Sequence, residues 1–251
     1  MAARVTHLWR HPIKGHGAES VDRTVLTAGQ TMPWDRVWAI AHEAARIDRG
    51  GDTWQPCVNF SRGAKSPELM AIGAQVDEAA GRVTLTHPRL APITVNPDLA
   101  EDAARLIDWV QPISDPDRAR PAFVARADRG MTDSDWPSVS VLNAVSLRAL
   151  GERAGRELAQ ERFRGNVWVE GFDAWEEFVW VGRRLRIGRA VLAVREPITR
   201  CKATAANAET GRIDVDTLGA LDAGWGHTDF GIYAEVIEGG EIAVGDGVVV
   251  E

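Results

Sequence analysis

Short apolar runs separated by glycines dominate residues 1–95, a pattern typical of strands joined by tight turns. Val5–Trp9 and Val37–Ala41 are brief apolar runs, and Val83–Thr86 alternates apolar with polar residues as a half-buried strand does. The segment Ala74–Ala80 fits either a helix or a strand. No other helical pattern of useful length occurs here, so the spacing predicts a small β region.

Two later segments carry helical spacing. We expect Asp98 to cap the first helix, with Glu101 three residues later completing a capping box. We expect Asn143 to cap the second helix. The apolar positions that support the two helices are Leu99, Ala103, Leu106, Ile107 and Val110, and then Leu147, Leu150, Ala154 and Leu158. Between the helices, the polar segment Asp128–Pro137 is expected to be an exposed or functional loop.

The chain then returns to strands. Asn166–Val169, Phe178–Ile187 and Ala190–Val194 are rich in Val and Leu, and Pro197 is expected in a turn. The last residues carry two glycine-containing turns between Val and Ile runs, which predicts a terminal β-meander. The whole pattern predicts a mainly β, barrel-like fold with α+β details and two or three helices. We divide it into a smaller β region at 1–97 and a larger domain at 98–251.

Composition narrows the class of protein. The 29 basic and 36 acidic residues give a formal net charge of −7, and no Lys/Arg run occurs, so we expect no nucleic-acid partner. No run of about 18 apolar residues exists to span a membrane, and the N-terminus lacks the apolar run of a secretory signal. Two cysteines are too few for a disulfide framework or a four-Cys zinc site. We therefore expect a cytoplasmic protein with free thiols.

The two cysteines differ in their neighbours. Cys201 lies between Arg200 and Lys202, and adjacent cations stabilise a thiolate, which is the nucleophilic and metal-ligating form. Cys57 follows Pro56 and precedes Val58, so we expect it to pack as a small apolar residue. The sequence therefore favours Cys201 as the chemically active cysteine.

Several motifs resemble a known family. RFRGNVWVEG, then WEEFVWVGRRLRIGRAVLAVREPITRC and an AETG turn, resemble the MOSC domain, named for the C-terminal domain of molybdenum-cofactor sulfurases. WRHPIKGHGAE and the Asp35-Arg36 pair resemble the N-terminal β-barrel region that accompanies it, and EGGEIAVGDGVVV resembles the last hairpin of the family. The resemblance covers nearly the whole chain. Three departures stand out: Gly15 replaces a serine, Gly165 replaces a proline, and GQTMPWDR precedes the Asp-Arg pair differently.

The resemblance implies a cofactor of the molybdopterin type, held between the two halves, with Cys201 as the catalytic residue and the molybdenum ligand. A thiolate is a soft ligand suited to such a metal, and arginine and lysine suit the phosphate of the cofactor. By motif position, the cofactor-binding residues are Lys14, Arg36, Arg164, Asn166, Arg200 and Tyr233. Two further candidates are Thr199, which lies beside the ligand Cys201, and Ser138, which comes from the loop before the second helix.

Each assignment has a simpler structural alternative. Arg36 could pair with a surface acid, Arg164 could stack on Phe163, Asn166 could bridge a turn, and Tyr233 could pack in a barrel. The spacing of His7, His11 and His16 matches no known zinc signature, and we expect His227 in an exposed loop, where Asp229 could pair with it. Trp168, Trp175 and Trp180 lie near the Arg164 strand, and core packing is the default for them.

The resemblance to the amidoxime-reducing component type implies an oxidoreductase that reduces small N-hydroxylated or related N–O compounds. Two cysteines cannot hold an iron–sulfur cluster, so a separate reductase or ferredoxin-like protein would supply the electrons. A sulfurtransferase carrying a persulfide on Cys201 is one alternative, and pyridoxal phosphate is not expected in this chain. A non-catalytic carrier of the cofactor is the other.

Overall fold

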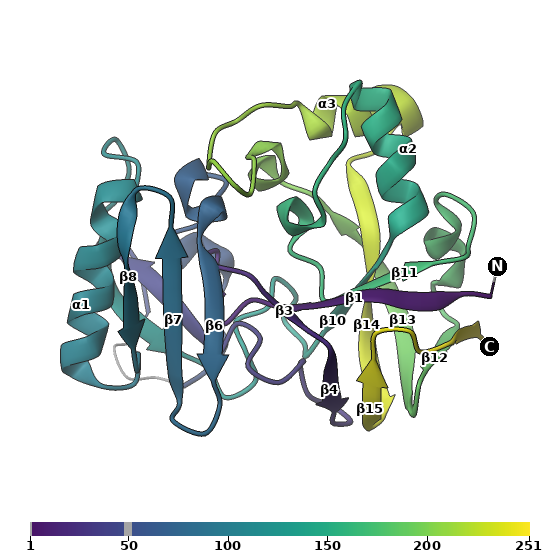
Figure 1. Ribbon diagram of the computed structural model, residues 1–251, viewed down its shortest axis with the longest axis horizontal. Helices are drawn as coiled ribbons and strands as arrows, with labels where there is room; N and C mark the ends of the chain where they lie inside the picture. Colours follow the sequence, from purple (N-terminus) through teal and green to yellow (C-terminus); the bar gives the residue numbers. More distant parts are fainter. Residues whose placement is uncertain (1, 48–51) are drawn as a thin grey trace.

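The computed structural model describes residues 2–47 and 52–251. Over these ranges the chain forms short strands in four sheets and three α-helices (Figure 1). The helices are α1 (Ala100–Val110), α2 (Ala144–Ala154) and α3 (Thr217–Trp225). The mainly β prediction is confirmed. No helix in these two ranges is long and apolar enough to cross a membrane.

A curled eight-stranded sheet forms the larger part, in the order β16-β12-β13-β14-β10-β11-β1-β3. Strands β1 and β3 come from the N-terminus, so the two ends of the chain share one sheet. Apolar side chains of its inner face, such as Val141, Leu192 and Ile232, form the main core. The strands are β1 (Arg4–Arg10), β3 (Glu19–Val21), β10 (Val139–Asn143), β11 (Val167–Glu170), β12 (Arg184–Ile187), β13 (Ala190–Thr199), β14 (Asp229–Glu238) and β16 (Val248–Val250).

Two three-stranded sheets and α1 form the smaller part, at the left of Figure 1. Trp38, Leu85 and Leu106 are buried in a second core between these elements. The ambiguous segment Ala74–Ala80 contributes to strand β6. The sheets comprise β2 (Ile13–Lys14), β5 (Trp38–His42) and β9 (Pro121–Arg126), and β6 (Gly73–Asp77), β7 (Arg82–His87) and β8 (Leu90–Val95).

The start of α1 differs from the expected capping box. Leu99 occupies the N-cap position, and no side chain caps the helix there. Asp98 instead accepts hydrogen bonds from Trp38 Nε1, at 2.8 Å, and from Arg126. Its carboxylate is drawn to two donors on β5 and β9, which a local motif cannot reveal. The second cap is confirmed, because Asn143 Oδ1 accepts from the backbone nitrogen of Val145 over 2.9 Å.

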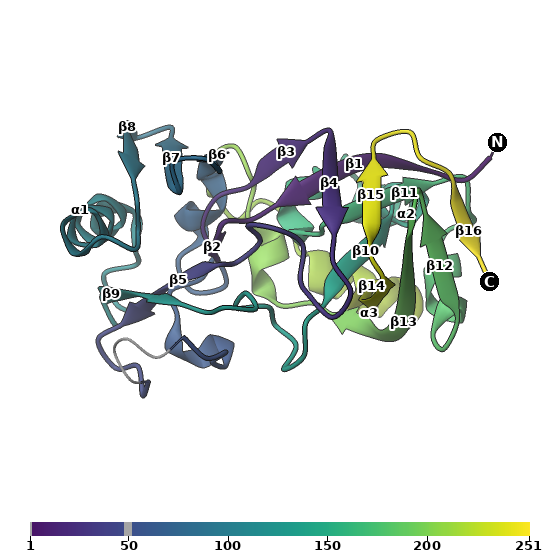
Figure 2. The ribbon, with the colours of Figure 1, turned by 90° about the horizontal axis from the view of Figure 1, so that it is seen from below.

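The C-terminal meander prediction is wrong. Strand β15 (Gly240–Ala243) pairs with β4 (Arg23–Leu26), and β16 pairs with β12 (Figure 2). The glycines turn the chain as expected, but β15 and β16 each pair with a strand from another part of the chain and not with the preceding strand. The expected strand Phe178–Ile187 also starts late, because Glu176–Trp180 forms a 3-10 turn that buries Trp180. Pro197 lies within β13, opposite Ile232 at a shift of register, rather than in a turn.

Candidate functional site

One cavity of about 440 Å³ is lined by both parts of the molecule. The smaller part and the segments next to it contribute Lys14, Arg36 and the segment that follows Cys57, and the larger sheet contributes the end of β13 and Tyr233. The cavity brings together seven of the residues that the sequence assigned to the site. These are Lys14, Arg36, Arg164, Thr199, Arg200, Cys201 and Tyr233.

Arg36 and Arg164 enter the cavity from strained backbone. Their φ angles of +56° and +48° lie in the left-handed region, which is uncommon for residues other than glycine. Arg36 Nη2 donates to the carbonyl oxygen of Arg164 over 2.8 Å, and Arg164 Nη1 donates to the carbonyl of Gly17 over 3.0 Å. Each such conformation costs about 1–3 kcal/mol and persists where surrounding contacts enforce it. The backbone strain is therefore located at two residues whose side chains line the cavity.

Two buried residues, Asp35 and His11, position Arg36: Asp35 contacts Arg36, and His11 contacts Asp35. Asp35 pairs with Arg36 and accepts from the backbone nitrogen of His11 over 2.8 Å. Burial would raise the pKa of Asp35, but Arg36 and His11 outweigh it and hold that pKa well below its usual range. Burial and the nearby Arg164 lower the pKa of His11 to about 3. His11 is therefore neutral, and its Nδ1 donates to Asp35 over 3.2 Å.

Lys14 forms hydrogen bonds with the polar loop Asp128–Pro137, which precedes β10. Its Nζ donates to the carbonyl oxygen of Met131 over 2.7 Å and to the Asp133 carboxylate. Burial lowers the pKa of Lys14, while the neighbouring Asp133 opposes that shift. The loop Asp128–Pro137 thus reaches the site, and Asp133 is a site residue that sequence reasoning did not single out.

The Arg200 guanidinium donates away from the Cys201 sulfur. Its Nε donates to the carbonyl of Phe230 over 2.7 Å, and Nη1 donates to that of Phe163 over 2.8 Å. The guanidinium also lies over both rings, 5.6 and 5.8 Å from their centroids. Burial lowers the pKa of Arg200 to about 10. Arg200 is therefore next to Cys201 in the sequence, but its hydrogen bonds go to backbone carbonyls and not to the Cys201 sulfur.

Cys201 lies two residues after the end of β13, just before a 3-10 turn, and it is exposed. The next turn is anchored by Thr204, whose Oγ1 donates to the Cys201 carbonyl over 3.1 Å. Thr199, two residues earlier, donates from Oγ1 to Asp229 over 2.6 Å. Tyr233 lies on β14, and burial raises the pKa of its phenol. The phenol therefore stays protonated at neutral pH and can donate a hydrogen bond into the cavity.

Two assigned residues do not line the cavity. Ser138 is buried and accepts from Ser134 Oγ over 2.7 Å. Asn166 is also buried, and its Oδ1 accepts from the backbone nitrogen and the hydroxyl of Ser140 over 3.1 and 2.8 Å. Its Nδ2 donates to the carbonyl of Trp9 over 3.2 Å. Asn166 thus bridges β10 and β1 behind the cavity wall.

Cys57 is a cavity residue that sequence reasoning missed. It was expected to be a packing residue, but it is half-buried and lines the same cavity as Cys201. Arg62 Nη1 lies 2.8 Å from its Sγ. No local signal reveals this, because an arginine five residues after a cysteine forms no known motif. The fold of residues 52–66 against the rest of the chain places both side chains at the cavity.

The aromatic candidates pack in the core. Trp168 and Trp180 are fully buried, and Trp175 stacks near Trp225 with ring centroids 4.1 Å apart. The His227 ring lies against Trp175, and its Nδ1 accepts from the backbone nitrogen of Asp229 over 3.1 Å. None of these side chains is among those that line the cavity.

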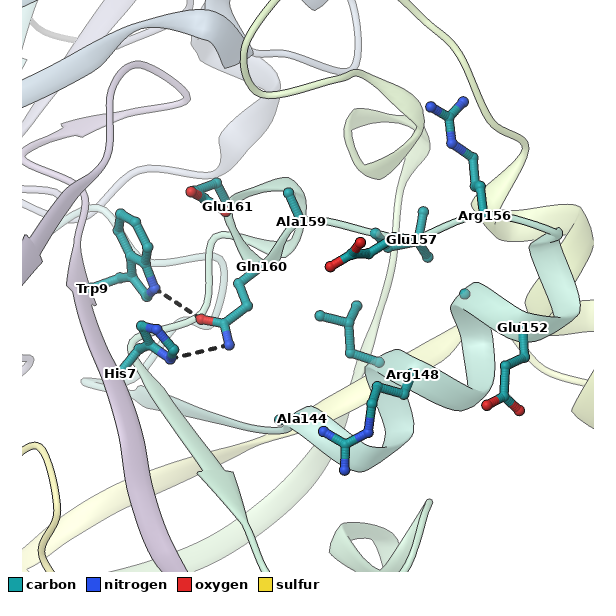
Figure 3. A pocket seen from close by; sticks show the side chains of 13 residues that line it. His7, Trp9, Ala144, Arg148, Glu152, Arg156, Glu157, Ala159, Gln160 and Glu161 are labelled. Atoms are coloured by element: carbon teal, nitrogen blue, oxygen red, sulfur yellow. Dashed lines mark hydrogen bonds between the residues drawn. The ribbon is translucent and has the colours of Figure 1, made fainter.

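A larger hollow of about 610 Å³ lies between β1, α2 and the segment after α2 (Figure 3). Gln160 lies on the β1 side of this hollow, where it accepts from Trp9 Nε1 and contacts His7 Nδ1, each at 3.2 Å. Its lining holds two arginines and three glutamates, and none of its described lining residues is a cysteine or an assigned site residue. The smaller cavity therefore remains the candidate site, because it combines unpaired positive charge with thiols.

Known families match the two halves of the chain. The MOSC N-terminal beta barrel domain matches residues 2–120, and the MOSC domain matches residues 128–249. The chain belongs to the MOSC domain family. The cavity of this MOSC protein is thus lined by residues from both matched domains.

Solved structures show more distant similarity. The YuaD protein from Bacillus subtilis is 12% identical, with 100% of this chain and 96% of that chain covered and a TM-score of 0.48. YiiM from Geobacillus stearothermophilus is 21% identical over 45% of this chain and 53% of that chain, with a TM-score of 0.35. YiiM from Escherichia coli is 17% identical with the same coverage and a TM-score of 0.33. No curated protein sequence matches the chain.

Proposed function

We propose that this MOSC protein binds a molybdenum cofactor in the cavity and that Cys201 is its metal ligand. The unpaired charge of the cavity carries this proposal. Lys14 pairs with Asp133 and Arg36 with Asp35, but no carboxylate in the described part of the chain pairs with Arg62, Arg164 or Arg200.

The lowered pKa values of Arg164 and Arg200 show that burying their positive charge is unfavourable. Burial and the neighbouring Arg36 lower the pKa of Arg164 to about 9, and burial lowers that of Arg200 to about 10. A buried cation without a counter-charge is unfavourable, so an anion in the cavity would offset this cost. The phosphate of a molybdopterin-type cofactor has the required charge, and the exposed Cys201 thiol is a soft ligand for its metal.

The residues of the chain have separate tasks in this proposal. Arg164 and Arg200 would hold the phosphate, while Asp35 orients Arg36 and Asp133 anchors Lys14 at the cavity wall. Tyr233 would donate a hydrogen bond from its protonated Oη to an oxygen of the substrate. The bound cofactor would supply two-electron oxo-transfer chemistry.

The reaction that we propose is the reduction of small N-hydroxylated or related N–O compounds. The support is the resemblance of the Arg200-Cys201 motif and its neighbours to the amidoxime-reducing type. Two cysteines cannot hold an iron–sulfur cluster, so the electrons would come from a separate reductase or ferredoxin-like protein.

Metal analysis tests the proposal. The protein is produced in a host that synthesises the cofactor, and molybdenum and pterin fluorescence are measured per chain. We expect stoichiometric molybdenum in the wild type, its loss in Cys201→Ser, and reduced occupancy in Arg164→Gln. Arg186→Gln is the matched control, because Arg186 is an exposed arginine that pairs with Glu251, and neither residue lines the cavity. Wild-type protein without molybdenum would contradict the proposal.

The exposed thiol of Cys201 also fits a sulfurtransferase. In that case, intact-mass analysis would find one extra sulfur atom on Cys201 in metal-free protein. A carrier of the cofactor would instead hold molybdenum but reduce no N-hydroxylated substrate with any electron donor supplied.

A further inference from the structure

The cavity contains both cysteines of the chain. Cys57 begins a 3-10 turn, Cys57–Asn59, and Cys201 immediately precedes another, Lys202–Ala205. Cys57 is half-buried and Cys201 is exposed, so a small molecule in the cavity can reach either sulfur. The segment after Cys57 lies close to the turn after Cys201, because a Cβ atom placed on Gly63 would lie 3.6 Å from that of Ala203.

A cation contacts Cys57 directly. Arg62 Nη1 lies 2.8 Å from Cys57 Sγ. Cys57 is also close enough to Lys14 to act on the pKa of that amine, which it raises. The Arg62 guanidinium can therefore stabilise the negative charge that a sulfur carries while it attacks an electrophile. Arg200 donates instead to backbone carbonyls. Cys57 is thus the cysteine better placed to attack first.

The cavity favours a negatively charged reaction partner. Arg164 and Arg200 have no carboxylate partner in the described ranges, and Nε of the buried Arg162 has no hydrogen-bond acceptor. A cleft with a surplus of positive charge concentrates anions. Small disulfides that carry carboxylates, such as oxidised glutathione, have this charge.

We propose that Cys57 and Cys201 form a redox-active thiol pair that a small anionic disulfide oxidises to an intramolecular disulfide. The Cys57 thiolate attacks one sulfur of the small disulfide, forming a mixed disulfide and releasing one small thiolate. The Cys201 thiolate then attacks Cys57 Sγ, forming the Cys57–Cys201 bond and releasing the second small thiolate. Two protein thiols are oxidised, and one small disulfide is reduced to two thiols.

This proposal goes beyond the proposed function, and it has a consequence for it. A sulfur engaged in a disulfide is no longer a thiolate and cannot ligate a metal. The thiol pair would therefore decide whether Cys201 is available to the cofactor. The two proposals fail separately, because one concerns a bond between two cysteines and the other concerns metal content.

The test uses the full chain, reduced, freed of small thiols and exposed to oxidised glutathione. Free thiols are counted, and peptides are mapped by mass spectrometry without reduction. We expect the loss of two hydrogens, no lasting adduct and a cross-linked peptide that joins Cys57 to Cys201. Cys57→Ser and Cys201→Ser should each retain one glutathione on the remaining cysteine, because the resolving thiol is absent.

Arg62→Gln should slow the reaction by about tenfold or more, since a hydrogen bond to a charged group contributes about 1.5–3 kcal/mol. Arg62→Lys should restore part of the rate, and Arg186→Gln, at an exposed arginine outside the cavity, should leave it unchanged. Thermal unfolding shows whether each variant is folded. Adducts that persist on both cysteines, or failure of the folded wild type to react, would overturn the proposal. If the disulfide forms in protein that never binds molybdenum, only the proposed function fails.

Discussion

Arg36 donates from Nη2 to the carbonyl oxygen of Arg164 over 2.8 Å, and both arginines have backbone in the left-handed conformation at the cavity. One guanidinium fixes the backbone that carries the other. This relationship links the smaller part of the molecule to the turn before β11 and helps an unfavourable backbone persist at Arg164, while backbone bonds to His11 and Met131 hold that of Arg36.

The backbone at Arg164 yields the first prediction. Arg164→Gly should be more stable than Arg164→Ala by about 1–2 kcal/mol, because a Cβ is disfavoured at positive φ. The measurement is urea denaturation of both variants. At Arg186, inside strand β12 and paired on both sides, the order should reverse by about 0.5–1 kcal/mol, because glycine weakens a strand. Equal stability of the two Arg164 variants would show that this conformation carries no strain.

The buried Asp35 yields a second prediction. Asp35→Asn should destabilise the fold by about 3–5 kcal/mol, because it leaves Arg36 without its partner. The folded-state pKa of Asp35 is lowered, so its contribution is present above the ordinary carboxyl pKa and is lost as pH falls below about 4. Thermal unfolding across pH measures this. Loss of stability in acid should be shallower in the variant than in the wild type, whereas exposed Asp117→Asn should follow the wild type.

Glu177 should change the stability of the fold with pH in the opposite direction to Asp35. It is fully buried under α2, where Oε2 accepts from Ser146 Oγ over 2.8 Å and Oε1 has no partner. Burial raises its pKa, so its protonated form favours the fold at low pH. That contribution is lost as pH rises from the ordinary carboxyl pKa through the raised value.

The measurement for Glu177 is the unfolding temperature of Glu177→Gln between about pH 4 and pH 8. Relative to this variant, the wild type should lose stability as pH rises. Exposed Glu157→Gln is the control and should follow the wild-type curve. A constant difference between wild type and Glu177→Gln would show that the buried carboxyl does not titrate in this range.

Gly165 provides a fourth prediction. A Cβ atom at this position would lie 2.1 Å from Leu142 Cδ1, so Gly165→Ala forces Leu142 to move. We expect a loss of about 1–3 kcal/mol, which is typical of overpacking. The double variant with Leu142→Ala should be less destabilised than the sum of the two single changes. Gly247→Ala, where the added Cβ meets nothing within 4 Å, should be close to neutral.

Denaturant unfolding of the four proteins measures this coupling. Additive losses in the double variant would mean that Leu142 is not the obstacle. The same contact gives a physical reason for glycine at this position, because Leu142 fills the space that a larger residue would need.

The sequence alone predicted much of the local structure. Asn143 caps α2 because its side chain reaches a backbone nitrogen two residues away, which is a relationship within one short segment. The alternation of Val83–Thr86 likewise predicted strand β7, since every second side chain faces the core. The motifs around Lys14, Arg36, Arg164 and Cys201 led to the MOSC family and named residues that share one cavity.

Only the tertiary structure decided which distant groups meet. Asp98 turned from a helix cap into a partner of Trp38, and β15 paired with β4 instead of forming a meander. Cys57 joined Cys201 in the cavity although 143 residues separate them in the sequence. Local spacing encodes periodicity and turns, because those depend on neighbouring residues. Pairing, burial and the environment of a thiol depend on segments brought together by packing of the whole chain, and no local pattern records them.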